Sequence, residues 1–438
     1  MKKALLVSYY FPPRFSIGGK RAFRFARYLP EFDWSTVVLT ARGPASERLD
    51  PTFQDLELPH CEIHRDYLTD SEIADLPKRS LGSDGTISEP TKMWGRAIPR
   101  FSRQWWANEF RFSPIVGPAL LDIPRIARRI ADLARRTHPD VIWATGSPWE
   151  TVVAATIAAR DVDIPFILDF RDPWSFGLSV GTSSTFLRVT NSAIEAAILR
   201  RAAMLTVTSE MTRDEYATRG AARRVECIRN GYDPAIRVVP RTLDRFTVVH
   251  FGNCYANRTL APFLRAAARA IEIGPIDRKN FKLLNLGRVS EQDVALVQEL
   301  GIADIFEYQT VLPYEEGLSI VAGADLALLL AFGDEPWFIP GKLYDYAAVR
   351  TPILSLSTSP ELDGLVERSG LGWVHPATEC DALAQRIVDV WKARRDGLEI
   401  VAPNDEVLES LSARNGAREL SSLFDDVMTN TERRAMER

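Results

Sequence analysis

Lys342 and Asp345 stand three residues apart, just after an apolar run. The run, residues 324–332, is typical of a parallel strand buried on both faces, and Pro340 and Gly341 favour the start of a helix after it. A helix N-terminus attracts phosphate, and Lys342 adds an ammonium there. Asp345 lies on the same helical face and is able to accept hydrogen bonds from sugar hydroxyls. The pair suits a nucleotide diphosphate, although an ion pair on a solvated helix explains it equally well.

Three ionisable residues, Asp169, Arg171 and Asp172, lie at the end of a second apolar stretch, 166–170. Charged side chains at a strand end have to be paired or used. The two carboxylates suit sugar hydroxyls and the guanidinium suits a phosphate, so these residues are candidates for positioning the reacting centre. A purely structural network of ion pairs is the alternative.

Two glycine-containing turns are further candidates for binding phosphate. Gly18 and Gly19 separate the first expected strand from the first expected helix, where adjacent glycines let the backbone approach an anion. Gly252 follows a later strand, and Arg258 comes six residues after it with a fork that fits two phosphate oxygens. A plain turn and an exposed arginine at a helix start are the simpler interpretations.

The elements that must position these residues alternate between strand and helix. Strands are expected at 4–8, 35–40, 141–144, 166–170, 204–208 and 224–228, and again at 247–251, 282–286 and 324–332. Helices are expected at 20–29, 150–160, 192–201 and 260–273. This order is typical of parallel βαβ units, in which ligands bind beyond the carboxyl ends of the strands. We therefore expect an α/β protein with two Rossmann-like parallel-sheet domains facing across a cleft.

The length of 438 residues also favours two domains. We expect an N-terminal domain over 1–238 that contains an insertion at 42–112. A C-terminal domain over 239–410 should follow, and then a helix over 411–438 that packs back towards the N-terminal domain.

Composition limits the class of protein. With 46% apolar residues, 26% charged residues and a net charge of −4, the chain resembles a soluble globular protein with no general attraction to nucleic acid. Four scattered cysteines without a CxxC, and no apolar signal segment, predict a cytoplasmic protein without structural zinc.

Arginines and aromatic residues are interleaved within the expected insertion. The residues concerned are Trp94, Arg100, Arg103, Trp105 and Trp106. The expected helix at 20–29 carries Lys20, Arg21, Arg24 and Arg27. Such composition suits peripheral contact with the inner face of a membrane. Packing of the insertion on its own domain is the other interpretation.

In combination, these loops resemble a GT-B glycosyltransferase of the family-4 type, a group of retaining enzymes that use sugar nucleotides. The matching segments are 9–13 with Gly18 and Gly19, 144–148, 169–174, 230–233 and 340–346. The resemblance implies a donor nucleotide held mainly by the C-terminal half. Lys342 and Arg258 would then face the diphosphate, and Asp345 would bind the ribose.

The resemblance also implies roles in the N-terminal half. Gly18 and Gly19 would lie under the diphosphate and the acceptor, and the 169–172 loop would lie near the transferred sugar. Enzymes of this type commonly carry two glutamates, and Asp345 stands at the second. Trp337 stands where the first glutamate is expected. Glu335 lies two positions before it and is a possible contact to the donor sugar.

The expected function is a glycosyltransferase that moves a sugar, with retention, from a UDP-sugar or other nucleotide-sugar to a polysaccharide- or lipid-linked glycan. No metal, cofactor or protein nucleophile is expected, because in this family the leaving phosphate helps to deprotonate the acceptor. A sugar-nucleotide epimerase and a non-catalytic protein that binds sugar nucleotides or glycans are the alternatives. Product release that depends on an added acceptor distinguishes transfer from both.

Overall fold

The structure is a computed structural model. It describes residues 1–14, 17–42, 49–53, 58–68, 118–176, 185–254, 259–310, 312–331, 333 and 336–436. The chain forms two compact units. Unit 1 contains Met1–Arg229 together with Gly416–Arg438, and unit 2 contains Asn230–Asn415.

Unit 1 is built on a parallel sheet that has seven strands within the described residues, in the order β3-β2-β1-β4-β5-β6-β7. The strands are β1 (Lys2–Ser8), β2 (Trp34–Leu39), β3 (Cys61–His64), β4 (Val141–Gly146), β5 (Phe166–Phe170), β6 (Met204–Val207) and β7 (Val225–Cys227). The helices are α1 (Ile17–Tyr28), α4 (Pro118–Thr137), α5 (Trp149–Val162), α6 (Thr185–Leu199), α7 (Glu210–Arg219) and α15 (Ala413–Met436).

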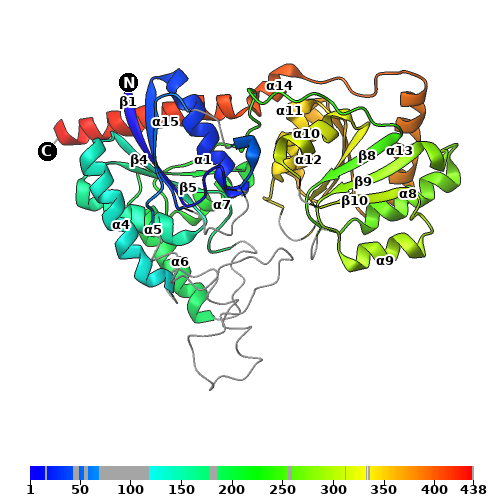
Figure 1. The fold of residues 1–438 in the computed structure, drawn as a ribbon. Helices are drawn as coiled ribbons and strands as arrows, with labels where there is room; N and C mark the ends of the chain where they lie inside the picture. Colours follow the sequence, from blue (N-terminus) through cyan, green and yellow to red (C-terminus); the bar gives the residue numbers. More distant parts are fainter. Residues whose placement is uncertain are drawn as a thin grey trace. The chain divides into compact units, whose positions relative to one another are not determined.

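Helices cover both faces of this sheet, which is why its central strands β4 and β5 are buried along their whole length and are mostly apolar (Figure 1). On one face Leu5 and Val7 share a core with α4 and α5. On the other face Trp143 meets Phe25 of α1, with ring centroids 5.5 Å apart. The register pairs Leu6 with Trp143, so alternate residues of each strand supply the two cores.

Unit 2 repeats the plan with a parallel sheet of six described strands, in the order β10-β9-β8-β11-β12-β13. The strands are β8 (Phe246–Phe251), β9 (Phe281–Leu286), β10 (Phe306–Gln309), β11 (Leu326–Ala331), β12 (Ile353–Ser357) and β13 (Gly372–His375). The helices are α8 (Ala261–Ile273), α9 (Glu291–Glu299), α10 (Tyr314–Gly323), α11 (Gly341–Val349), α12 (Pro360–Ser369), α13 (Cys380–Arg395) and α14 (Asp405–Ser410). The prediction of two Rossmann-like parallel sheets is confirmed.

Some elements differ from the expectation. α1 begins at Ile17 rather than at Lys20, so Gly18 and Gly19 belong to its first turn. The stretch 42–112, expected to interrupt the pattern, contains the edge strand β3, whose mixed sequence Cys-Glu-Ile-His is only partly buried. No strand was expected at β10, β12 or β13, and the two edge strands β10 and β13 likewise lack the long apolar run that marks a central strand.

In the described residues, no helix combines the length and the apolar character needed to cross a bilayer.

Candidate functional site

Lys342 lies at the carboxyl edge of the unit 2 sheet. It is the second residue of α11, whose N-cap position is Pro340. Its side chain runs across Gly252, at the end of β8, so closely that a Cβ on Gly252 would lie 2.7 Å from the Lys342 Nζ. Gly252 also has a φ of 152°, which side chains disfavour. Glycine here lets the ammonium lie at a strand end, beside the amides of a helix N-terminus.

Buried polar groups hold the turns beneath this ammonium. Asn285, at the end of β9, donates to the carbonyl of Gly287 at 2.8 Å, and its Oδ1 lies 2.6 Å from the Nδ1 of His250. The amide of Cys254 donates to the Arg288 carbonyl at 2.8 Å. The turns after β8 and β9 are therefore joined to each other. Burial raises the pKa of the Cys254 thiol to about 12, so this cysteine stays a neutral thiol rather than a nucleophile.

Asp345 is half-buried one turn further along α11. Its Oδ1 accepts a hydrogen bond from the phenol of Tyr314, the first residue of α10, at 2.5 Å. The next residue, Tyr346, accepts from the amide of Phe251 at 3.1 Å and donates to the Leu328 carbonyl at 3.0 Å. These bonds fix α11 against β8 and β11. They orient Asp345, and its second oxygen, Oδ2, accepts no hydrogen bond from the residues that the structure describes, so its contact with a ribose stays a prediction.

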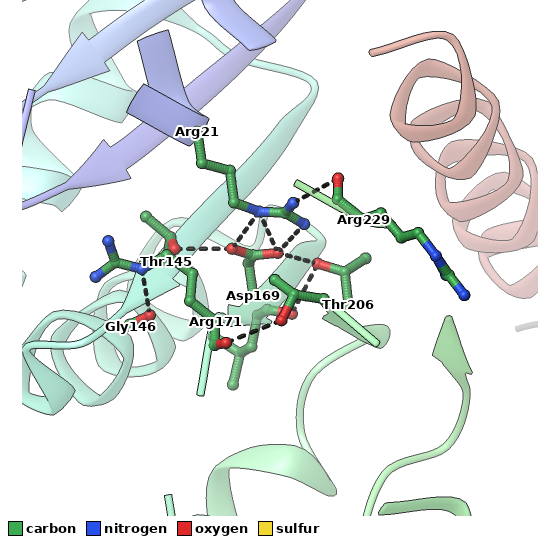
Figure 2. A network of polar contacts seen from close by, with 9 residues as sticks. Arg21, Thr145, Gly146, Asp169, Arg171, Thr206 and Arg229 are labelled. Atoms are coloured by element: carbon green, nitrogen blue, oxygen red, sulfur yellow. Dashed lines mark hydrogen bonds and ion pairs between the residues drawn. The ribbon is translucent and has the colours of Figure 1, made fainter. Parts of the chain in front are cut away.

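Asp169 is fully buried inside unit 1, at the end of β5. Its carboxylate accepts hydrogen bonds from Arg21 (Nη2, 2.8 Å), Thr145 (Oγ1, 2.7 Å) and Thr206 (Oγ1, 2.7 Å). Figure 2 shows these side chains around the carboxylate, and Arg21 also donating to the Arg229 carbonyl. Asp169 thus joins α1, β4, β5 and β6. These contacts form a structural network, which was the alternative to a direct contact between Asp169 and a sugar. The cation of this network is Arg21.

Arg171 is held by three backbone carbonyls. Its Nε donates to Gly146 at 2.8 Å, its Nη1 to Gly18 at 2.5 Å and its Nη2 to Ser147. Burial is the main cause that lowers the pKa of Arg171, and the neighbouring carboxylates oppose it. The guanidinium therefore connects the end of β4, the end of β5 and the first turn of α1. The next residue, Asp172, is exposed.

The two glycines of the first turn of α1 both allow a close approach. A Cβ on Gly18 would overlap the guanidinium of Arg171. A Cβ on Gly19 would lie 3.0 Å from the backbone of Phe11. Packing alone therefore accounts for both glycines, and their contact with a diphosphate stays a prediction.

A buried carboxylate, Glu195 of α6, supports the loop that follows Arg171. Glu195 accepts a hydrogen bond from the Tyr216 hydroxyl at 2.5 Å, and that hydroxyl accepts one from the amide of Trp174 at 3.1 Å. Ser175 also bonds to the Glu195 carboxylate. Burial is the largest cause that raises the pKa of Glu195.

The stability of unit 1 should therefore depend on the protonation of Glu195. Its pKa is higher in the folded than in the unfolded chain, so its contribution is fully present below the ordinary value of 4.5 and is lost as pH rises through the folded pKa. We expect the unfolding free energy of the wild type, followed by urea titration, to fall across this window relative to that of Glu195→Gln. Parallel pH profiles for the two proteins would contradict this.

Several predicted site residues lie outside the described residues. They are Arg258 and Glu335 in the C-terminal half, and Trp94, Arg100, Arg103, Trp105 and Trp106 in the N-terminal half. Their roles stay predictions. The prediction that the cations of α1 form an exposed surface is wrong for Arg21 and Arg24, because both are buried. Among the residues with described positions, no group of three or more His, Cys, Asp or Glu side chains is placed to hold a metal ion.

Sequence reasoning missed the partners that hold the candidate residues. Arg21 is 148 positions from Asp169, and Tyr314 is 31 positions from Asp345. Neither pair forms a short sequence motif that could have predicted the contact. The one available signal was the expected strand order, because residues that follow neighbouring parallel strands meet at one edge of the sheet.

Comparison with known proteins identifies the family. Residues 18–231 match the glycosyl transferase 4-like domain. This part of the chain is a glycosyl transferase 4-like domain, and the whole chain has the GT-B fold. The predicted resemblance is thus confirmed, and the match includes the Arg21–Asp169 pair and Arg171.

Individual relatives of these glycosyltransferases are distant. WcaL of Salmonella typhimurium, whose name assigns it to colanic acid biosynthesis as a glycosyltransferase, is 27% identical over 155 residues, which cover 34% of this chain and 37% of WcaL. The structure of α,α-trehalose 6-phosphate synthase from Burkholderia multivorans superposes with a TM-score of 0.62 at 12% identity, covering 100% of this chain and 98% of the synthase. Anabaena HepE in complex with UDP-glucose gives 0.52 at 14% identity, covering 100% and 99%. At these identities the two structures show the GT-B fold alone.

Proposed function

We propose that the chain transfers a sugar, with retention, from a UDP-sugar to a polysaccharide- or lipid-linked glycan in the cytoplasm. The observation that carries the proposal is the position of Lys342. Its ammonium lies across Gly252 at the junction of β8 and the N-terminus of α11. Two sources of positive charge meet there, at the carboxyl edge of a parallel sheet, where such folds bind nucleotides.

Unit 2 supplies the groups for each part of the donor. Lys342 and the first amides of α11 would bind the diphosphate. The Oδ2 of Asp345 would accept from a ribose hydroxyl while Tyr314 holds Oδ1 in place. Arg258, which follows the Gly252 turn in sequence, would bind a second phosphate oxygen, and Glu335 would reach the donor sugar.

The reaction needs stabilisation of the charge that develops on the leaving diphosphate. The ammonium of Lys342 and the dipole of α11 would provide it without a metal ion. The leaving phosphate would then help to deprotonate the acceptor hydroxyl. We propose Arg171 and Asp169 as positioning residues, since both act through their neighbours, and the exposed Asp172 as a direct contact to the transferred sugar.

The choice of UDP and of a glycan acceptor is supported by relatives. HepE, which shares the fold, was crystallised with UDP-glucose, and the name of WcaL places it in the synthesis of a polysaccharide.

The test has two steps. A thermal-shift screen of UDP-, GDP-, ADP- and dTDP-sugars should show that UDP-sugars raise the melting temperature, because a ligand that binds the folded chain stabilises it by mass action. Release of UDP should then depend on an added glycan or lipid-linked acceptor, and should persist in EDTA. Donor conversion without acceptor would replace transfer by epimerisation, and binding without turnover would leave a sugar-nucleotide-binding protein.

A further inference from the structure

Each of three adjacent strands in unit 1 is followed by an arginine. Arg14 follows β1, Arg42 follows β2 and Arg65 follows β3. The three strands are parallel neighbours in the order β3-β2-β1, so all three arginines belong to the carboxyl edge of the sheet. That is the edge at which this type of sheet binds ligands.

Arg14 is a buried cation in an aromatic setting. Only 7% of the residue is exposed, and its guanidinium lies 5.0 Å from the ring centre of Tyr9 and 5.1 Å from that of Tyr10. Its Nη1 donates to the Tyr9 carbonyl at 3.2 Å. Burial among rings removes water from the guanidinium, so its charge acts more strongly on neighbouring charged groups than it would in water.

Arg65 is half-buried against the same loop. Its Nη2 donates to the Pro12 carbonyl at 2.6 Å, and its guanidinium lies 6.0 Å from the ring centre of Phe11. Within the described residues, the Arg65 guanidinium therefore contacts a carbonyl and a ring, with no carboxylate among these contacts. Burial is the largest cause that lowers the pKa of Arg65, and the positive charges of Arg14 and Arg42 lower it further. Arg14 and Arg42 are thus both close enough to Arg65 to repel it.

The arginines also adjoin Arg171. The ring of Tyr10 approaches Gly18, where a built Cβ would lie 3.1 Å from its Cδ2. Burial raises the pKa of the Tyr10 hydroxyl, whereas the charges of Arg14 and Arg171 both lower it. Tyr10 therefore lies between the arginine cluster and the guanidinium that the proposed function places at the reacting centre.

We propose that Arg14, Arg42 and Arg65 form a binding site for a phosphate or diphosphate group carried by the acceptor. Arginine forks match phosphate oxygens in pairs, and a bound dianion would relieve the mutual repulsion of the three cations. The assignment of the anion to the acceptor rests on the proposed function, because Lys342 of unit 2 already serves the donor. Acceptors that present such a group include polyprenyl-phosphate-linked and polyprenyl-diphosphate-linked glycans and soluble sugar phosphates.

The experiment measures binding of inorganic pyrophosphate to the full chain by calorimetry, with UDP present at saturation to occupy the donor site. We expect Arg65→Gln to weaken pyrophosphate binding about tenfold or more, since a charge-assisted hydrogen bond is lost. Arg65→Lys, which keeps the charge but not the fork, should retain part of the affinity. The matched control is Arg136→Gln, which removes one exposed arginine at the end of α4, just before β4 begins and hence at the opposite edge of the sheet.

A second arm identifies the source of the anion. Flotation with phosphatidylcholine vesicles containing polyprenyl phosphate should recover the wild type and Arg136→Gln but not Arg65→Gln if the acceptor is lipid-linked. Binding of free pyrophosphate alone would support the site for a soluble acceptor. Equal behaviour of Arg65→Gln, Arg136→Gln and the wild type in both arms would overturn the proposal. Failure of UDP to bind in the same titrations would instead count against the proposed function.

Discussion

Asp169→Asn is expected to destabilise unit 1 by about 3–5 kcal/mol, because it leaves the buried guanidinium of Arg21 without its counter-ion. In the wild type Arg21 and Asp169 are both buried, and their closest atoms are 2.8 Å apart. Asparagine keeps the size of the side chain but turns an amide N–H₂ or a neutral oxygen towards the cation. Amide hydrogen exchange of β4 and β5 in increasing urea measures the change in unit 1 separately from unit 2.

A matched control is available in the same unit. Arg135 and Asp161 also form an ion pair, at 2.5 Å, but 52% and 60% of their side chains are exposed. Asp161→Asn should cost less than about 1 kcal/mol, since water screens exposed pairs. The double variant Arg21→Met with Asp169→Asn should be less destabilised than the sum of the single variants. Additive losses, or equal effects of the two aspartate substitutions, would show that the buried pair is not the cause.

Lys342→Ala is expected to reduce UDP-sugar turnover by a factor of about 10²–10³, with little change in folding stability. The attraction between this cation and the leaving diphosphate becomes stronger as negative charge develops in the transition state. Removing the cation therefore lowers mainly the rate of the reaction. The lysine is half-buried and lies over Gly252 at the surface of the turn, so its removal opens no core cavity. Steady-state kinetics and the UDP-dependent thermal shift are the two measurements.

Lys392→Ala is the control for this substitution. Lys392 is an exposed residue on α13, so its removal changes the charge of unit 2 by the same amount at another place. We expect wild-type kinetics and a wild-type shift with UDP. If Lys342→Ala and Lys392→Ala behaved alike, the assignment of the diphosphate to the α11 N-terminus would be wrong.

Most central strands of both units, though not β12, were predictable because burial on both faces leaves a simple pattern. The strand β11, Leu-Ala-Leu-Leu-Leu-Ala, is an apolar run, and the strand β5, Phe-Ile-Leu-Asp-Phe, is apolar except for Asp169. Edge strands such as β3 and β13 lie half in solvent, so their mixed sequences resemble those of loops. The family could be recognised because its motifs follow the predictable central strands.

Only those site residues that come directly after a predicted strand could be predicted from the sequence. Lys342 and Arg171 were found as charged residues placed where strands end. The carbonyls that hold Arg171 belong to Gly18 and to the adjacent residues Gly146 and Ser147, and nothing in the sequence connects Gly18 with the other two. Gly18 was interpreted as a turn that approaches a ligand, whereas in the structure it makes room for a side chain 153 positions away. A single sequence does not distinguish these two reasons for a glycine.

The path of the backbone between the units has a consequence for biosynthesis. Unit 2 interrupts unit 1, whose last helix, α15, begins at Ala413, near the end of unit 2, and belongs to unit 1 from Gly416 on. Phe424 of that helix packs edge-on against Trp34 at 4.9 Å, and Asp425 pairs with Lys2. A ribosome therefore releases the whole N-terminal sheet long before the helix that covers Trp34 exists. Until translation nears completion, the nascent chain carries an exposed tryptophan surface, which is a natural point for chaperone contact.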